Sequence, residues 1–172
     1  MEDLLAQLAA HKLDIVLADE PASSSHKFRM FTHLLGSSGV CFCAAPRLAA
    51  RLRRDFPASL NNAPALLPAE NTALRRSIEK WFQERQIRPR IVGEFDDIAL
   101  MNVMAADEKG FVPVPKVVTS EAAARFRLRE IAALDECREE FYAITAERRI
   151  VHPAALAITK NAQAQVFGNH GK

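Results

Sequence analysis

Polar side chains, most of them carboxylates, follow several apolar runs of this 172-residue sequence. They are Asp19 and Glu20, then Glu70, Asn71 and Thr72, then Glu94, Asp96 and Asp97 with Phe95 among them. Hard cations prefer oxygen ligands, so an acidic site built from these residues would favour a small cation or a basic metabolite over an organic anion. The alternative, that these acids are solvated loop residues, is left open.

Two of these segments also stand where a helix is expected to begin. Asn71 or Thr72 can cap the helix that follows, because a side-chain oxygen there accepts a hydrogen bond from a backbone N–H two or three residues on. The dipole favours Asp96 or Asp97 at the start of the next helix. Only one of two adjacent acids can occupy a cap, so the other is free to face a ligand.

The remaining reactive residues do not indicate an enzyme or a cofactor site. Ser23–Ser25 precede His26, but no glycine-flanked nucleophile or glycine-rich phosphate loop accompanies them. Cys41 and Cys43 stand two apart in a predicted strand and so share a face, without the further ligands of a metal site. We expect reduced, partly buried thiols, and no catalytic activity.

Composition excludes several classes of protein. The chain is 49% hydrophobic with a formal net charge of +2, which argues against wholesale disorder and against a surface that coats nucleic acid. It has no apolar run of the roughly 18 residues that a membrane helix needs. Its first residues are acidic where an export signal would be basic, so we expect a cytoplasmic protein without a membrane anchor.

Strand and helix patterns alternate along the chain. Strands are predicted at 14–18, 40–44, 65–68, 90–95, 111–115 and 140–145, and helices at 4–12, 47–56, 72–86, 98–109 and 153–166. The run 14–18 is apolar enough for a strand covered on both faces, as in a parallel sheet, and 98–104 predicts a helix buried all round. This order indicates an α/β fold, in which ligands bind beyond the carboxyl ends of the strands.

Five segments carry a resemblance to a known family. Residues 74–82, 89–101, 111–115, 140–144 and 147–153 resemble the effector-binding region of LysR-type transcriptional regulators, in the branch of the sodium/proton-antiporter activators. The similarity extends over residues 4–167.

The resemblance implies a periplasmic-binding-protein-like (type II) α/β fold of two subdomains, the first of them incomplete. Residues 1–38 and 145–172 would form the remainder of subdomain I, and 39–144 would form subdomain II. A small-molecule or cation effector would bind between them. By position, the site corresponds to Asp19, Glu20, Glu70, Asn71, Thr72, Phe95, Asp96, Asp97 and Pro113. A cytoplasmic homo-oligomer, most often a dimer, is implied.

The sequence also departs from the family. No segment corresponds to the winged helix-turn-helix, so DNA contact is expected only through that absent domain. The first strand of subdomain I is missing too, which would leave residues 15–17 at an open sheet edge. Two alternatives are a truncated oligomerisation module that does not sense, and a transport-type solute-binding protein, which would need an export signal.

Overall fold

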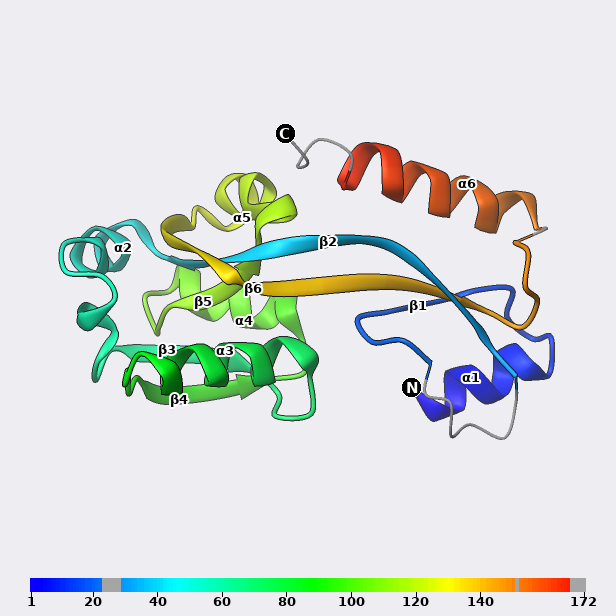
Figure 1. The fold of residues 1–172 in the computed structure, drawn as a ribbon. Helices are drawn as coiled ribbons and strands as arrows, with labels where there is room; N and C mark the ends of the chain where they lie inside the picture. The colour runs from blue at the N-terminus through cyan, green and yellow to red at the C-terminus, as the bar shows by residue number, and fades with distance from the viewer. Residues whose placement is uncertain (23–28, 151, 168–172) are drawn as a thin grey trace. The chain divides into compact units, whose positions relative to one another are not determined.

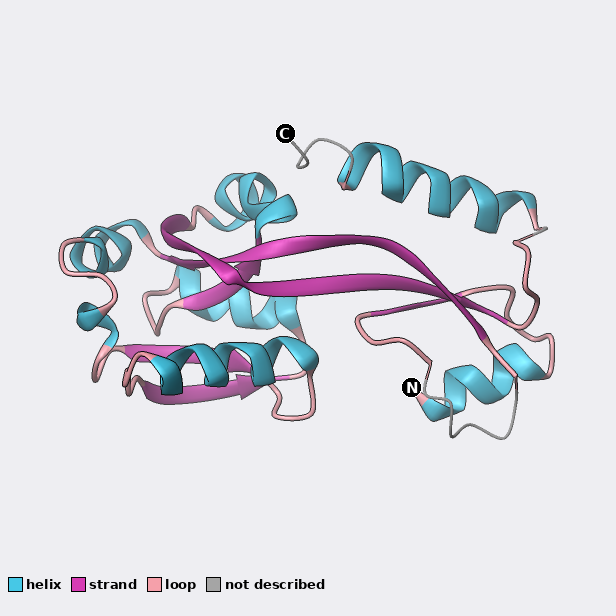
Figure 2. Cartoon of the chain, viewed as in Figure 1, coloured by secondary structure: helices cyan, strands magenta, loops and turns pink. Residues whose placement is uncertain are grey.

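The computed structural model describes residues 1–22, 29–150 and 152–167, excepting the side chains of residues 135 and 165. Ser23–Ser25 and His26 lie outside these residues. Helices and strands alternate in a mixed α/β fold (Figure 2). The chain divides into two compact units, unit 1 formed by Met1–Ser38 with Glu140–Lys172, and unit 2 formed by Gly39–Glu139.

Unit 2 contains most of the regular elements (Figure 1). They are α2 (Pro46–Arg53), β3 (Pro64–Pro68), α3 (Ala73–Glu84), β4 (Arg90–Phe95), α4 (Ile98–Ala106), β5 (Val112–Pro115) and α5 (Thr119–Phe126), with 3₁₀ turns at Ala58–Leu60 and Lys116–Val118. The long strands β2 (Phe31–Ala44) and β6 (Arg129–Thr145) belong to both units and are neighbours in a sheet of order β1–β6–β2–β5.

The strands of unit 2 are held in register by backbone hydrogen bonds. β3 and β4 are parallel, with Pro68 opposite Phe95 at their carboxyl ends. Beside β3, Phe111 N donates to Pro64 O and Leu66 N donates to Phe111 O, both at 2.9 Å. β5 continues from Phe111 and pairs antiparallel with β2.

Alternate residues of β2 and β3 face two different cores. Phe42 and Leu67 pack in one cluster with α3, whereas Cys41, Cys43 and Leu66 pack in the other with α4. The period-2 side-chain geometry of a strand produces this division. It confirms that the two thiols share one face of the strand.

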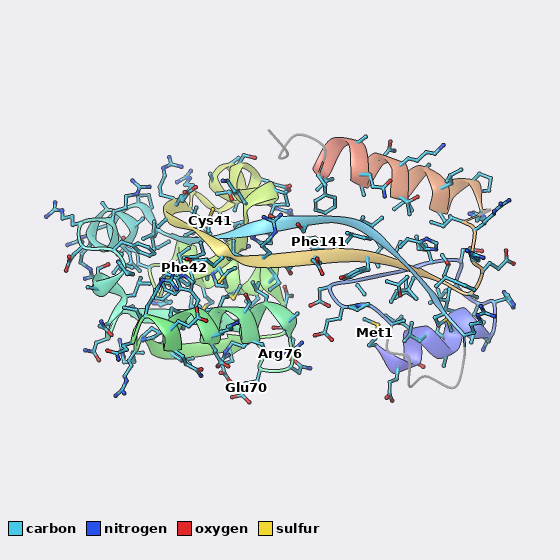
Figure 3. All side chains as sticks on the ribbon, in the orientation of Figure 1. Met1, Cys41, Phe42, Glu70, Arg76 and Phe141 are labelled. Carbon is cyan, nitrogen blue, oxygen red and sulfur yellow. The ribbon has the colours of Figure 1, made fainter. Side chains whose placement is uncertain are left out.

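An aromatic cluster fills the first of these cores. Phe42 extends from β2 (Figure 3), and its ring lies 5.7 Å from that of Trp81, 5.6 Å from that of Phe82 and 4.9 Å from that of Phe111. Leu74, Ile78, Trp81 and Phe82 line the buried side of α3, as their helical spacing predicted. Burying these large rings against α3 supplies much of the hydrophobic stabilisation of unit 2.

The three cysteines are reduced and buried. Burial, with a smaller contribution from neighbouring Cys41, raises the pKa of the Cys43 thiol to about 12. Burial also raises the pKa of Cys41 and of Cys137. All three thiols are therefore protonated at neutral pH, which makes them poor nucleophiles and poor metal ligands.

Unit 1 has α1 (Glu2–Ala9), β1 (Val16–Ala18), α6 (Pro153–Asn161) and a π-helical turn (Ala162–Val166). It also contains residues 31–38 of β2 and 140–145 of β6. Leu5 and Leu8 of α1 pack with Val16 and Ile144 in its small core. β1 lies at the edge of its sheet and pairs with β6. Its position at a sheet edge agrees with the open edge expected for residues 15–17.

Three sequence expectations about individual elements were wrong. β1 is antiparallel to β6 and Leu17 is 56% exposed, so this strand is not covered on both faces. α4 buries Met101 and Ala105 but exposes Leu100 and Val103, because only one of its faces packs on the strands. β2 and β6 extend well beyond 40–44 and 140–145. Pairing within the sheet holds residues in an extended conformation even where their sequence has little strand pattern.

The end of the described chain is anchored in unit 1 by Phe167. Its ring centroid lies 5.3 Å from that of Phe141, and Gln163 Nε2 donates to Leu34 O at 3.2 Å. Gly36 permits this arrangement, because a Cβ at that position would overlap the body of the Phe167 side chain. Gly39, in the same strand, has only Lys116 Cδ within 4.0 Å of such a Cβ.

We therefore expect Gly36→Ala to lower the free energy of unfolding by about 1–3 kcal/mol, because Phe167 must move off Phe141. Gly39→Ala is the matched control and is expected to change it by less than about 0.5 kcal/mol. Urea unfolding followed by circular dichroism measures both. Equal stability of the two variants would contradict the packing of Phe167 on Gly36.

Candidate functional site

The carboxyl ends of β3 and β4 meet at one edge of the two-stranded sheet. Pro68 pairs with Phe95, and just beyond them Ala69 N donates to Phe95 O at 2.9 Å. Because the two strands are parallel, the segments that follow them leave the sheet at the same edge. The segments Glu70–Thr72 and Asp96–Asp97, far apart in the sequence, therefore adjoin one another.

Each of these segments ends in the N-cap of a helix. Thr72 Oγ1 accepts from Arg75 N at 3.2 Å and caps α3. Asp97 Oδ1 accepts from Ala99 N at 2.8 Å and from Leu100 N at 3.1 Å, and so caps α4. Among the alternatives that the sequence left open, Thr72 and Asp97 are the caps. Asn71 and Asp96 are the residues whose side chains are not used in these caps.

Arg75 ties the ends of the two strands together. Its guanidinium donates to Pro68 O at 2.8 Å, to Glu94 Oε1 at 2.7 Å and to Glu79 Oε1 at 2.7 Å, and the residue is only 2% exposed. Burial by itself would lower the pKa of Arg75, but its hydrogen bonds to Glu94 and Glu79 outweigh burial and raise it. This arginine is charged at every physiological pH.

The structure brings six of the nine predicted site residues to this edge: Glu70, Asn71, Thr72, Phe95, Asp96 and Asp97. Glu70, Asn71, Asp96 and Asp97 are exposed, and Figure 3 shows Glu70 at the loop that leads into α3. Pro113 is buried in β5 opposite Phe42 and lines a separate pocket. Asp19 and Glu20 follow β1 and belong to unit 1.

Sequence reasoning missed Arg75. A basic residue beside the apolar positions of α3 is typical of a solvated side chain. Only the folded structure shows that its guanidinium is buried against the Pro68 carbonyl. Glu79, four residues on, was the available signal, because an Arg–Glu pair at this spacing shares one helix face.

The acidic character of the edge is lower than the sequence suggested. Glu94 is paired with Arg75, and one oxygen of Asp97 is used by the helix cap. Within the described part of the chain, no three His, Cys, Asp or Glu side chains are grouped so that they could hold a metal ion. Among the residues that the structure describes, Glu70 and Asp96 are the exposed carboxylates of the predicted site that neither join an ion pair nor cap a helix.

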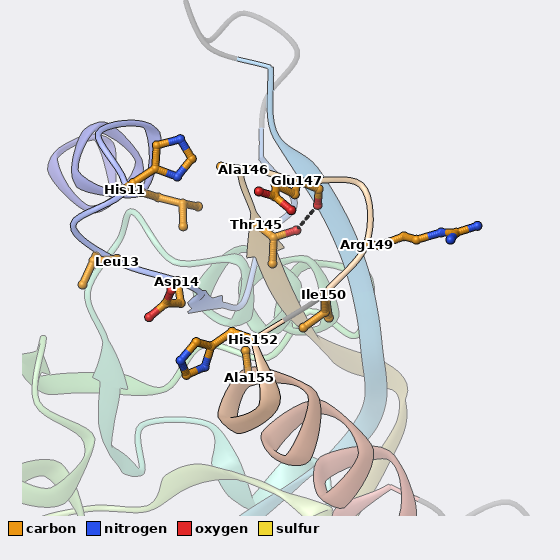
Figure 4. Close-up of a pocket in the computed structure, with 11 residues that line it drawn as sticks. His11, Leu13, Asp14, Thr145, Ala146, Glu147, Arg149, Ile150, His152 and Ala155 are labelled. Atoms are coloured by element: carbon orange, nitrogen blue, oxygen red, sulfur yellow. Dashed lines mark hydrogen bonds between the residues drawn. The ribbon is translucent and has the colours of Figure 1, made fainter.

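Unit 1 contains a small polar pocket of about 70 Å³, which Figure 4 shows in close-up. Thr145, at its wall, donates to Glu147 O at 2.7 Å and therefore accepts from His33 Nε2 at 2.9 Å. His11, Asp14 and His152 also line the pocket. Its mixed charges and small volume do not indicate a particular ligand class.

Comparison with known proteins gives the family. Residues 1–165 match the family model of the LysR substrate binding domain. The chain belongs to this family.

A curated relative is similar along almost the whole chain. The transcriptional activator protein NhaR of Escherichia coli (strain K12) is 34% identical over 167 residues, which are 96% of this chain and 54% of NhaR. The chain thus spans about half the length of the curated relatives it matches.

Solved regulatory domains of the family share the fold. The regulatory domain of HypT from Salmonella typhimurium matches with a TM-score of 0.69 at 14% identity, over 95% of this chain and 79% of that one. The regulatory domain of Synechocystis PCC6803 CcmR, in complex with 2-PG, matches with a TM-score of 0.63 at 14% identity, over 96% and 79%. The predicted type II periplasmic-binding-protein-like α/β fold is thereby confirmed.

We expect Arg75→Met to lower the free energy of unfolding by about 2–3 kcal/mol, because the buried Pro68 carbonyl loses its donor and Glu94 and Glu79 lose their ion-pair partner. Arg51→Met, the same change at an exposed position of α2, is the control and is expected to cost less than about 0.5 kcal/mol. Thermal and urea unfolding measure both. A loss no larger for Arg75→Met than for the control would contradict this role of Arg75.

Proposed function

We propose that this chain is the effector-sensing part of a LysR-type transcriptional activator of the sodium/proton-antiporter type. The observation that carries the proposal is the convergence of two strand ends and two helix starts at one edge of β3–β4, in a chain of this family. Ligands of α/β proteins bind at such edges, where helix N-termini offer backbone N–H groups.

The proposed effector is a small cation or a basic small molecule. Glu70 and Asp96 are its proposed direct contacts in unit 2, because they are exposed carboxylates at the edge. Thr72 and Asp97 cap the two helices at the edge. Phe95 and Asn71 are the other predicted site residues at this edge. Asp19 and Glu20, which follow β1 in unit 1, stay predicted site residues, and Pro113 lies in β5 and lines another pocket.

Signalling in this proposal is a difference of affinity between two arrangements of the regulatory domain. An effector that binds one arrangement more tightly shifts the equilibrium toward it, by no more than that difference in binding free energy. The domains are proposed to act as a cytoplasmic homo-oligomer, with DNA bound by a separate domain. The role is regulatory rather than catalytic. No helix in the described part of the chain is long and apolar enough to cross a membrane.

Calorimetric titration with sodium, lithium and potassium chlorides tests the effector class, with choline chloride to correct for ionic strength. We expect the three ions to give different heats, and Asp96→Asn to weaken the preferred ion by about tenfold, or 1.4 kcal/mol. Asp107→Asn is the matched control, because Asp107 ends the same helix that Asp97 begins.

Asp97→Asn and Asp97→Ala separate charge from capping in the same titration. Asparagine caps a helix as well as aspartate, so the first variant removes charge only, whereas the second also loses about 1 kcal/mol of stability. If all three ions give identical heats and neither Asp96→Asn nor Asp97→Asn changes them, the effector is not an alkali-metal cation.

A segment exchange tests the regulatory role itself. This chain replaces the corresponding half of the Escherichia coli NhaR sequence, and transcription from a promoter that this relative activates is measured with and without sodium chloride. Activation that responds to the salt supports the proposal. Constant transcription at all salt concentrations, from a soluble chimaera that binds the promoter, would favour an oligomerisation module without sensing.

A further inference from the structure

A cavity of unit 2 lies between α4, β5 and α5. It measures about 140 Å³, and its walls are formed by Ile98, Asn102, Pro113, Val114, Ala122 and Phe126. A cavity of about 150 Å³ with apolar walls accommodates a benzene ring. The pocket is therefore large enough for one compact organic molecule of that size.

Asn102 is the unusual residue in this wall. It is 8% exposed, and its side-chain Oδ1 has no hydrogen-bond partner among the described residues. Its neighbours on the buried side of α4, Met101 and Ala105, are apolar core residues. A buried amide oxygen without a partner destabilises the fold, and such groups in native proteins call for an explanation. A ligand that donates a hydrogen bond in this pocket would remove the penalty.

The surroundings of the pocket limit the charge of such a ligand. Glu121 and Arg125, four residues apart on α5, both line the pocket and are both exposed, so opposite charges stand together on its solvent side. The inner walls are apolar. A charged ligand would lose its hydration without gaining a buried counter-ion, whereas a neutral one would not.

We propose that this pocket binds a neutral, compact and largely apolar molecule, such as a monocyclic phenol or alcohol, which donates a hydrogen bond to Asn102 Oδ1. The binding site lies wholly within unit 2 and is lined by none of the edge carboxylates Glu70, Asp96 and Asp97, although Ile98, next to Asp97, forms part of its wall. It does not depend on the identity of the effector proposed above.

Phenol is the probe, and the full chain with ¹³C-labelled methyl groups is titrated by nuclear magnetic resonance. We expect phenol to shift the methyl signals of Ile98, Val114 and Val118 in a saturable manner. Toluene, which cannot donate the hydrogen bond, is expected to bind at least about tenfold more weakly. Benzoate, which is charged, is expected to leave these signals unchanged.

Two substitutions locate the binding. Asn102→Leu is expected to weaken phenol binding at least about tenfold, to leave toluene binding unchanged or tighter, and to raise the melting temperature because an unpaired polar group is removed. Ala122→Leu fills the pocket and is expected to abolish binding of both molecules. Ala124→Leu, the same change at an exposed position of α5, is the matched control and should bind as the wild type does.

Absence of a saturable shift with phenol, equal affinity for phenol and toluene, or undiminished binding by Ala122→Leu would each overturn the proposal. The methyl spectrum of each variant reports whether it is folded, and Asn102→Ala replaces Asn102→Leu if the larger side chain disrupts the core. Glu70→Gln, at the edge of β3–β4, is expected to leave phenol binding unchanged. The two proposed sites can therefore fail independently.

Discussion

The buried guanidinium of Arg75 is the contact on which the arrangement of unit 2 depends. It joins the last carbonyl of β3 to Glu94 of β4 and to Glu79 of its own helix. Because Arg75 holds the ends of both strands, it also holds the start of the two loops that follow them. The positions of the two helix starts depend on these loops. A buried charge is costly unless it is fully paired, and here every partner comes from an element that borders the proposed effector site.

Packing on the two faces of β3 completes this arrangement. Leu67 faces the aromatic core under α3, and Leu66 faces the apolar core under α4. The helices that begin at Thr72 and Asp97 are thus held against opposite faces of the same strand. Binding at the edge can therefore affect both helices. The pocket with Asn102 lies on the side of α4 that packs in the second core.

Membership of the LysR substrate binding domain family gives the fold of the chain, and the local geometry gives the residues that we propose as its effector site. The family model covers residues 1–165, and the edge formed by Glu70–Thr72 and Phe95–Asp97 is where an α/β protein presents helix N-termini to a ligand. The sequence and the structure differ in the charge of this edge. Pairing of Glu94 and capping by Asp97 leave fewer carboxylates for a cation than the sequence suggests, which is why charge-neutralising variants are informative.

The sequence by itself determined the α/β class, the family, the buried side of α3 and the shared face of Cys41 and Cys43, because these follow from local periodicity and motif order. It also narrowed the helix caps to two pairs of neighbours. Only the tertiary structure decided which neighbour acts as the cap, that Arg75 is buried against Pro68 and that one face of α4 is exposed. It also decided that Asn102 Oδ1 has no hydrogen-bond partner among the described residues. Each of these depends on which segment packs against a residue from far along the chain, and local sequence does not encode that contact.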